Sequence, residues 1–351
     1  MTVQPTTHPT EIMDEVAALA RERVSAEDID LVLAFVEGYY AGVSPDDLAE
    51  RKPDDLYGAA AAHLNLARRR APGTPKIRVY NPQVEQHGWQ STHTVVEIVT
   101  DDMPFLIDSV RMVLNRRGYT SHLVVHPVMR LRRGDGDRVE AFLALDDEAE
   151  GSAVEAVIHI ETDRQTEQEA LDAMGAEVLA ALDDVRAAVE DWAAMREELR
   201  RSIADLRATP PPVDPEELAE TCAFLEWIEN NHFTFLGFAA FGVERTGGRD
   251  SGGRDRYVAV PGTGLGLLRD EGGRAREAFA NLPLPRRRRD PQEPELLVLS
   301  RADVRSTVHR PSHLDYIGIR QFDAEGNVRE VRRFLGLYTS AAYNRVPRDI
   351  P

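Results

Sequence analysis

Three stretches of this sequence carry residue types that could do chemistry. The first is Asp101–Asp108 (DDMPFLID), where acids and a proline stand just ahead of an amphipathic pattern. Free backbone N–H groups at a helix start attract anions, so such a turn could hold the carboxylate of a small ligand. The other two are the glycine run GTGLG at 262–266 and the pair His309 and His313 with Asp315 nearby. Anion, nucleotide and metal binding are therefore the chemistries to consider.

The glycine run does not have the spacing of a dinucleotide site. That site needs G-x-G-x-x-G at the start of a helix, so that the pyrophosphate meets free N–H groups. Here the spacing is G-x-G-x-G, and the following LLRDEGGR has too many glycines for a helix start. We predict a structural turn at 262–266, and the P-loop signature is absent from the sequence. No cofactor-binding residue is predicted in this chain.

The histidines do not predict a metal centre. Pro311 breaks any helix that would bring His309 and His313 to one face, and no third ligand is convincing. His122 and His126 lie on one face of a predicted strand, where a solvated or hydrogen-bonded face is the simpler interpretation. No Ser/His/Asp or Cys/His arrangement can be assembled. We therefore predict neither metal ligands nor catalytic residues.

The turn at Asp101–Asp108 therefore remains the candidate site for a small effector. Asp101 or Asp102 stands where a helix N-cap is needed, Pro104 falls in the first turn, and Asp108 adds charge near the positive helix end. The alternative is that these residues merely cap the helix and seal the core. The predicted effector-binding set is Asp101, Asp102, Met103, Pro104, Phe105 and Asp108.

A strand, a helix and a second strand must position this turn. Thr94, Val96 and Ile98 alternate with their neighbours in the period-2 pattern of a strand. The helix after the turn has one apolar stripe, and Gly118 follows it where a left-handed C′ residue is favoured. The second strand continues to Arg133. Further strands are predicted at Lys76–Tyr80, 139–145 and 154–160, with an edge or a bulge at Pro127.

A long helix is predicted after the last of these strands. A capping box at Thr166–Glu169 opens it, and apolar residues then recur in steps of three and four to Leu206. These residues form an apolar seam along the helix that is too long for one small sheet to cover. We expect its far half to pack on another helix, in this chain or in another one.

Composition and charge exclude several classes of protein. The chain has 351 residues and a net charge of −18, so nucleic acid is not an expected partner. The single cysteine, Cys222, cannot form an internal disulfide, and its apolar neighbours favour a buried structural thiol. Neither a signal peptide nor a membrane span of about 20 apolar residues is evident, so we expect a cytoplasmic protein that does not bind membranes.

Several long strings resemble the N-terminal region of the large bacterial NAD-dependent glutamate dehydrogenases, and the strand-turn-helix-strand unit resembles an ACT-type regulatory domain. The resemblance covers most of the chain, with 134–155 and 242–256 fitting less well. The strings are DDMPFLIDSV (101–110), SHLVVHPVMRLRR (121–133), HIETDRQ (159–165), FLEWIENNHFTFLGF (224–238), PGTGLGLLR (261–269), STVHRPSHLDYIGI (306–319) and RRFLGLYTSAAYNRVPRDIP (332–351).

This resemblance implies oxidative deamination of L-glutamate to 2-oxoglutarate and ammonium, with NAD as the hydride acceptor of the full-length enzyme. In that family the catalytic and NAD-binding portions lie beyond the position matching Pro351, so the resemblance implies a non-catalytic segment. It also implies a homo-oligomer in which this segment works with the catalytic portion of the same polypeptide. In ACT domains the loop between a strand and the following helix binds small effectors, often amino acids. The alternatives are a stand-alone ACT-type amino-acid sensor and an oligomerisation module.

The predicted fold class is α+β, with a helical leader, an ACT-like ββαββα domain closed by the long helix, and a second mixed domain for which a PAS-like fold is one option. The expected parts are a disordered leader at 1–24, short helices at 25–74, the ACT-like domain at 75–208, a Pro-rich linker at 209–213, and the second domain at 214–351, truncated at its C-terminal connection.

Overall fold

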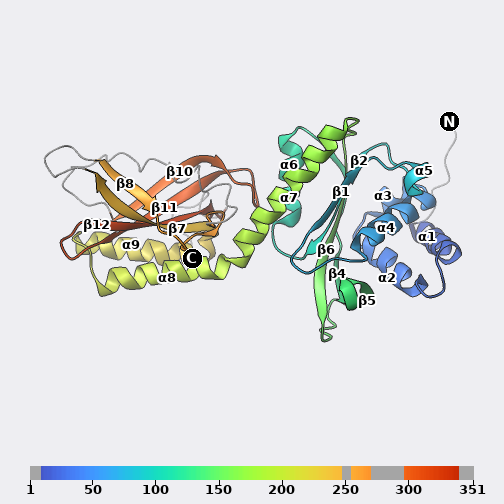
Figure 1. Cartoon of the computed structure of the whole chain (residues 1–351). Coiled ribbons are helices and arrows are strands. Elements are labelled where there is room, and N and C mark those ends of the chain that lie inside the picture. The colour runs from blue at the N-terminus through green and yellow to red at the C-terminus, as the bar shows by residue number, and fades with distance from the viewer. Residues whose placement is uncertain (1–8, 247–253, 270–295, 340–351) are drawn as a thin grey trace. The chain divides into compact units, whose positions relative to one another are not determined.

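The polypeptide forms two compact units, and the described residues of each form an antiparallel six-stranded sheet and helices (Figure 1). The structure is a computed structural model that describes residues 9–246, 254–269 and 296–339. The units comprise Met1–Leu182 and Asp183–Pro351. The predicted α+β class is confirmed. The first eight residues of the predicted leader and the predicted C-terminal truncation at 340–351 lie outside the described residues.

Within the described residues, four helices precede the first sheet, and the first of them lies in the stretch that we expected to be disordered. The predicted disordered leader at 1–24 is corrected from Pro9 onward, because the first helix lies there. Ile12, Val16 and Ala20 recur every four residues, and each is at most 3% exposed, so burial of this stripe stabilises the helix. The helices are α1 (Pro9–Arg23), α2 (Ile29–Tyr40), α3 (Pro45–Ala49) and α4 (Pro53–Ala67).

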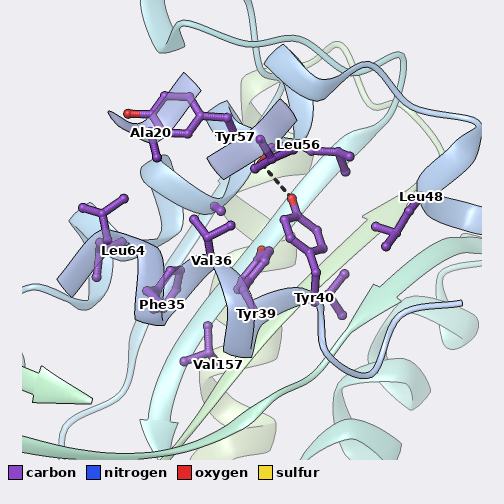
Figure 2. Close-up of a cluster of buried hydrophobic side chains, with 14 of the residues drawn as sticks. Ala20, Phe35, Val36, Tyr39, Tyr40, Leu48, Leu56, Tyr57, Leu64 and Val157 are labelled. Carbon is purple, nitrogen blue, oxygen red and sulfur yellow. Dashed lines mark hydrogen bonds between the residues drawn. The ribbon is translucent and has the colours of Figure 1, made fainter. Parts of the chain in front are cut away.

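These helices share one hydrophobic core with the first sheet (Figure 2). Phe35 lies at its centre with no exposed surface and stacks on Tyr39 at 5.3 Å between ring centroids. The Tyr40 hydroxyl donates a hydrogen bond of 2.7 Å to the Leu56 carbonyl, the dashed line in Figure 2, which ties α2 to α4. The sheet contributes Leu123, Val125, Met129 and Val157. The helices are therefore part of the first unit and not a separate appendage.

The first sheet has more strands than the predicted ββαββα order. Its observed order is ββαββββα, apart from two short helical turns at α5 (Val84–His87) and η1 (Asp135–Asp137). The predicted strand that continues to Arg133 is divided at Pro127, which has no N–H to donate to a ladder. The strand that we expected at 139–145 is also present, and the ββαββα order does not include it. The strands are β1 (Lys76–Tyr80), β2 (Thr94–Asp101), β3 (Ser121–Val125), β4 (Val128–Arg133), β5 (Val139–Leu143) and β6 (Ser152–Thr162).

The central strand β6 pairs with β2, β3 and β4, all antiparallel. The spatial order is β1-β2-β6-β4-β5, with β3 beside another part of β6. The helix between β2 and β3 is α6 (Leu106–Arg116), and Gly118 beyond it has a φ of 79°, as predicted for its C-terminus. Strand β6 therefore joins β2, β3 and β4 directly, whereas β1 pairs with β2 and β5 pairs with β4.

The start of α6 differs from the predicted cap. β2 continues through Asp101, which pairs in register with Glu155, so this acid belongs to the strand. The N-cap residue is Phe105, with a φ of 73°, and its side chain makes no capping hydrogen bond. The predicted N-cap at Asp101 or Asp102 is therefore wrong, because extended strand backbone places both residues too early.

The second unit begins within the long helical region. The predicted single helix is divided at Asp191 into α7 (Gln168–Glu190) and α8 (Trp192–Ala208). The Asp191 carboxylate accepts hydrogen bonds from the Gly266 N–H at 2.7 Å and from Arg269 at 2.6 Å. The apolar residues of α8 pack on Cys222, Leu225 and Ile228, so the far half of the seam does cover another helix of this chain.

A curled antiparallel sheet completes the second unit, in the order β10-β11-β12-β7-β8 with β9 beside β7. We expected a domain boundary at the Pro-rich stretch 209–213, but the compact units divide at Leu182 and Asp183 within α7. The reason is that α8 shares a core with the next helix. The elements are α9 (Pro215–Trp227), η2 (Ile228–His232), β7 (Phe233–Thr246), β8 (Arg254–Ala259), β9 (Leu265–Gly266), β10 (Leu297–Arg305), β11 (His313–Phe322) and β12 (Val328–Tyr338).

Within the described ranges, the helices all lack the combination of length and apolarity that a bilayer crossing requires.

Candidate functional site

One acid of the predicted effector turn, Asp101, makes hydrogen bonds that stabilise the fold. One Asp101 oxygen accepts a hydrogen bond from Arg70 Nη2 at 2.6 Å, and the other accepts one from the Gly73 N–H at 3.0 Å. The Asp102 N–H donates to the Val154 carbonyl, while its side chain is exposed. Pro104 and Asp108 are also exposed, and Met103 and Phe105 are half-buried. The structure thus brings the six residues together, but Asp101 holds the loop after α4.

A pocket of about 460 Å³ lies elsewhere in the first unit. The connection between α3 and α4, the first turn of α4, the loop ahead of β2, and β6 form its walls. Such a volume falls within the range of small-molecule sites in proteins. The lining residues are Glu50, Arg51, Lys52, Asp55, Gln90, Ser91, Thr92, His93 and Glu161.

Glu161 is the buried charge of this pocket, at 1% exposed. Arg51 donates to its two oxygens at 2.6 and 3.1 Å, and His93 Nδ1 lies 3.1 Å from Oε2. Burial acts to raise the pKa of Glu161, but the contacts with His159 and Arg51 outweigh it and hold that pKa at about 2. The pocket therefore keeps an ionised carboxylate at neutral pH.

A second cavity of about 20 Å³ shares Arg51, Asp55, Gln90 and Glu161 with this pocket. It is roughly the size of one water molecule. Trp89 and His159 contribute to its wall, and in the described part of the chain His159 Nδ1 has no hydrogen-bond partner. The cavity is too small to admit a ligand side chain, so a ligand of the larger pocket would remain on the outer side of Glu161.

His63, Glu97 and His159 are buried near this cavity, and their potential ligand atoms lie within 4.8 Å of one another. Most of these atoms already have partners. His63 Nδ1 lies 3.1 Å from the Tyr39 hydroxyl and Nε2 lies 3.2 Å from the Ile98 carbonyl. Arg78 and Tyr80 donate to the two oxygens of Glu97. We conclude that this cluster is a hydrogen-bond network and fits a metal ion poorly.

The buried histidine of this network makes stability depend on pH. Burial lowers the pKa of His63 from 6.5 to about 4, although Glu97 acts in the opposite direction. Between these two values the unfolded chain binds a proton that the folded chain excludes, so stability is present above pH 6.5 and is lost as the pH falls toward 4. The expected loss from pH 7 to pH 5 is about 2 kcal/mol. Urea unfolding at both pH values measures it, and His63→Gln is expected to lose less over the same range.

The other sequence candidates take structural roles. The glycine run 262–266 forms a turn and β9, as predicted, and the Gly266 N–H is bound by Asp191. That turn therefore does not fit the pyrophosphate of NAD. His313 Nδ1 lies 3.1 Å from the Ala302 carbonyl. Cys222 is buried, as the sequence analysis predicts. His122 pairs with Asp163 at 2.7 Å and stacks on His93 at 4.3 Å, a contact that the sequence did not suggest.

The pocket was missed because its residues come from distant parts of the sequence. Arg51 and Glu161, for example, are 110 positions apart. One signal was present: Glu97 and Glu161 are acids within otherwise apolar strand patterns, and a buried charge needs a partner. That signal predicts ion pairing but not a pocket.

This chain is similar to glutamate dehydrogenases both in a comparison with protein families and in a comparison with individual proteins. A family profile described as the glutamate dehydrogenase ACT1 domain matches residues 35–178. An NAD-specific glutamate dehydrogenase of Halomonas elongata is 36% identical over 343 residues, which are 97% of this chain and 21% of the relative. The enzyme of that description from Pseudomonas aeruginosa is 37% identical over 326 residues, or 91% and 19% of the two chains. The chain spans about a fifth of the length of these relatives.

Proposed function

We propose that this chain, which is similar to NAD-specific glutamate dehydrogenases over most of its length, is the N-terminal regulatory and assembly segment of such an enzyme. The observation that carries this proposal is the match to the ACT1 domain within a chain that covers only about a fifth of its relatives. The whole enzyme would convert L-glutamate and NAD to 2-oxoglutarate, ammonium and NADH in the cytoplasm. Catalysis and NAD binding would belong to other parts of that polypeptide.

We further propose that this segment regulates the enzyme by binding an amino-acid effector. The turn of the predicted site supports this, since Asp102, Pro104 and Asp108 are exposed around the positive-φ residue Phe105. ACT-like topology and a PAS-like second unit remain part of the proposal. The supporting features are the β2-turn-α6-β3 arrangement and the curled antiparallel sheet of the second unit.

Calorimetric titration with a panel of amino acids tests the effector proposal. We expect heat of binding from at least one amino acid, and a weaker response in Asp102→Ala if the turn contacts it. Asp147→Ala removes an equally exposed acid from the loop between β5 and β6 and should leave binding unchanged. The absence of heat with every amino acid would overturn effector binding.

Two alternatives belong to other classes. A stand-alone amino-acid sensor would bind the effector without an attached enzyme, whereas an oligomerisation module would bind none. Leu179 in α7 and Trp192 at the start of α8 are each 41% exposed and favour self-association. A strictly monomeric sedimentation profile at high protein concentration would count against assembly through this segment.

A further inference from the structure

The 460 Å³ pocket carries unpaired charges of both signs. Lys52 and Glu50 line it, both are exposed, and the structure gives neither side chain an ion pair or hydrogen bond within its described ranges. Arg51 uses two of its five N–H donors on Glu161, which leaves three, and its side chain is 28% exposed. The Asp55 Oδ1 accepts the Gln90 N–H at 3.1 Å, and within the described residues Oδ2 has no hydrogen-bond donor.

The two signs restrict what this pocket can hold. A phosphate or other polyanion would meet Glu50, Asp55 and the ionised Glu161. A metal cation would meet Lys52 and Arg51. Like charges at contact distance oppose binding, so neither class is favoured. A small molecule that carries both a carboxylate and an ammonium group can pair with both sets at once.

The lining residues also restrict which side chains of a ligand the pocket favours. All nine lining residues are polar or charged, and aliphatic side chains are absent from this set. Most small-molecule pockets are lined mainly by apolar side chains, which bind apolar groups by removing them from water. The apolar surface of this pocket comes only from the carbon atoms of polar and charged residues, with polar groups close by. The lining therefore favours a ligand whose side chain carries polar groups.

We propose that this pocket binds a free polar α-amino acid, with its carboxylate held by Lys52 and Arg51 and its ammonium group facing Glu50 and Asp55. This inference rests on the proposed regulatory function and moves its effector site from the turn before α6 to this pocket. These four partners lie in the connection between α3 and α4 and in the first turn of α4 (Figure 1), and Glu161 of β6 holds Arg51 in place through their ion pair.

The lysine content of the chain allows a direct test, because Lys52 and Lys76 are its only lysines. The chain is treated with an acylating reagent in the presence of L-glutamine or of L-leucine, and the Lys52-to-Lys76 labelling ratio is measured by mass spectrometry. Both amino acids consume reagent equally, and Lys76 in β1 serves as the internal control. At about ten times the dissociation constant of glutamine we expect that ratio to fall about tenfold. Leucine should leave it unchanged.

Calorimetry of two variants completes the test. Lys52→Ala is expected to weaken glutamine binding about tenfold, since it removes a charged hydrogen-bond donor. Lys52 makes no side-chain cap for α4, so the fold should be unaffected. The matched control Lys76→Ala should bind as the wild type does.

The outcomes separate this site from the broader proposal. Glutamine binding that is lost in Asp102→Ala and unchanged in Lys52→Ala would overturn the pocket and leave the regulatory function intact. Equal protection of Lys52 by leucine would overturn the polar class of ligand. If no amino acid gives heat or protection, both the pocket and the effector proposal are wrong.

Discussion

Replacement of Phe35 with alanine is expected to destabilise the first unit by about 3–5 kcal/mol. Phe35 has no exposed surface and lies among residues of α1, α2 and α4 and of the sheet (Figure 2). Truncation removes the transfer free energy of the ring and leaves a cavity that a core held by four elements fills only in part. The free energy of unfolding in urea measures the effect.

The reporter for this experiment should be Trp89, which is 2% exposed and the only tryptophan of the first unit. A background that carries Trp192→Phe and Trp227→Phe removes the fluorescence of the second unit. Leu145→Ala, at a residue that is 58% exposed, is the control and should change stability by no more than about 0.5 kcal/mol. A loss below about 1 kcal/mol in Phe35→Ala would mean that the leader helices do not share the core of the sheet.

Replacement of Glu155 with glutamine is expected to cost about 3–5 kcal/mol. Arg70 Nη2 and Arg133 Nη2 each lie 2.7 Å from a Glu155 oxygen, and the two arginine side chains are 1% and 9% exposed. Burial acts to raise the pKa of Glu155, but hydrogen bonds from Arg133 and Arg70 lower it, so the carboxylate is ionised at neutral pH. The variant leaves two buried guanidinium groups with less opposing charge, and unfolding in urea measures the loss.

A matched pair in the same sheet gives the control. Arg132 and Glu140 lie 3.5 Å apart, but their side chains are 46% and 51% exposed, so Glu140→Gln should cost less than about 1 kcal/mol. The double variant Arg70→Met/Glu155→Leu removes the opposing charges together and should lose less than the sum of its single variants. Equal small losses in Glu155→Gln and Glu140→Gln would mean that the buried network does not tie α4 to the sheet.

Local periodicity predicted the elements that lie near one another in sequence. The alternating residues of β2 and the apolar stripe of α6 were readable because each pattern repeats within one element. The same signal was present in α1, but the polar stretch ahead of Ile12 suggested disorder. The burial of α1 depends on α3 and α4, which lie more than 20 residues further along the chain.

Tertiary contacts decided the features that the sequence did not predict. The helix after β2 begins at Leu106 and not at Asp102, because Asp101 is held in the strand by pairing with β6 and by Arg70. The predicted effector turn thus loses one of its acids to the fold. The pocket around Glu161 needs four segments to meet, and residue spacing along one chain does not specify such a meeting.

The intact mass of the native polypeptide in its source cell, detected with an antibody raised against this segment, tests whether the chain is part of a larger enzyme. We expect a product several times heavier than a chain of 351 residues, since this chain spans about a fifth of the length of its relatives. That result would make this chain the regulatory and assembly segment of a dehydrogenase. A product of about the mass of this chain alone would contradict the account and would leave a free-standing sensor or oligomerisation module.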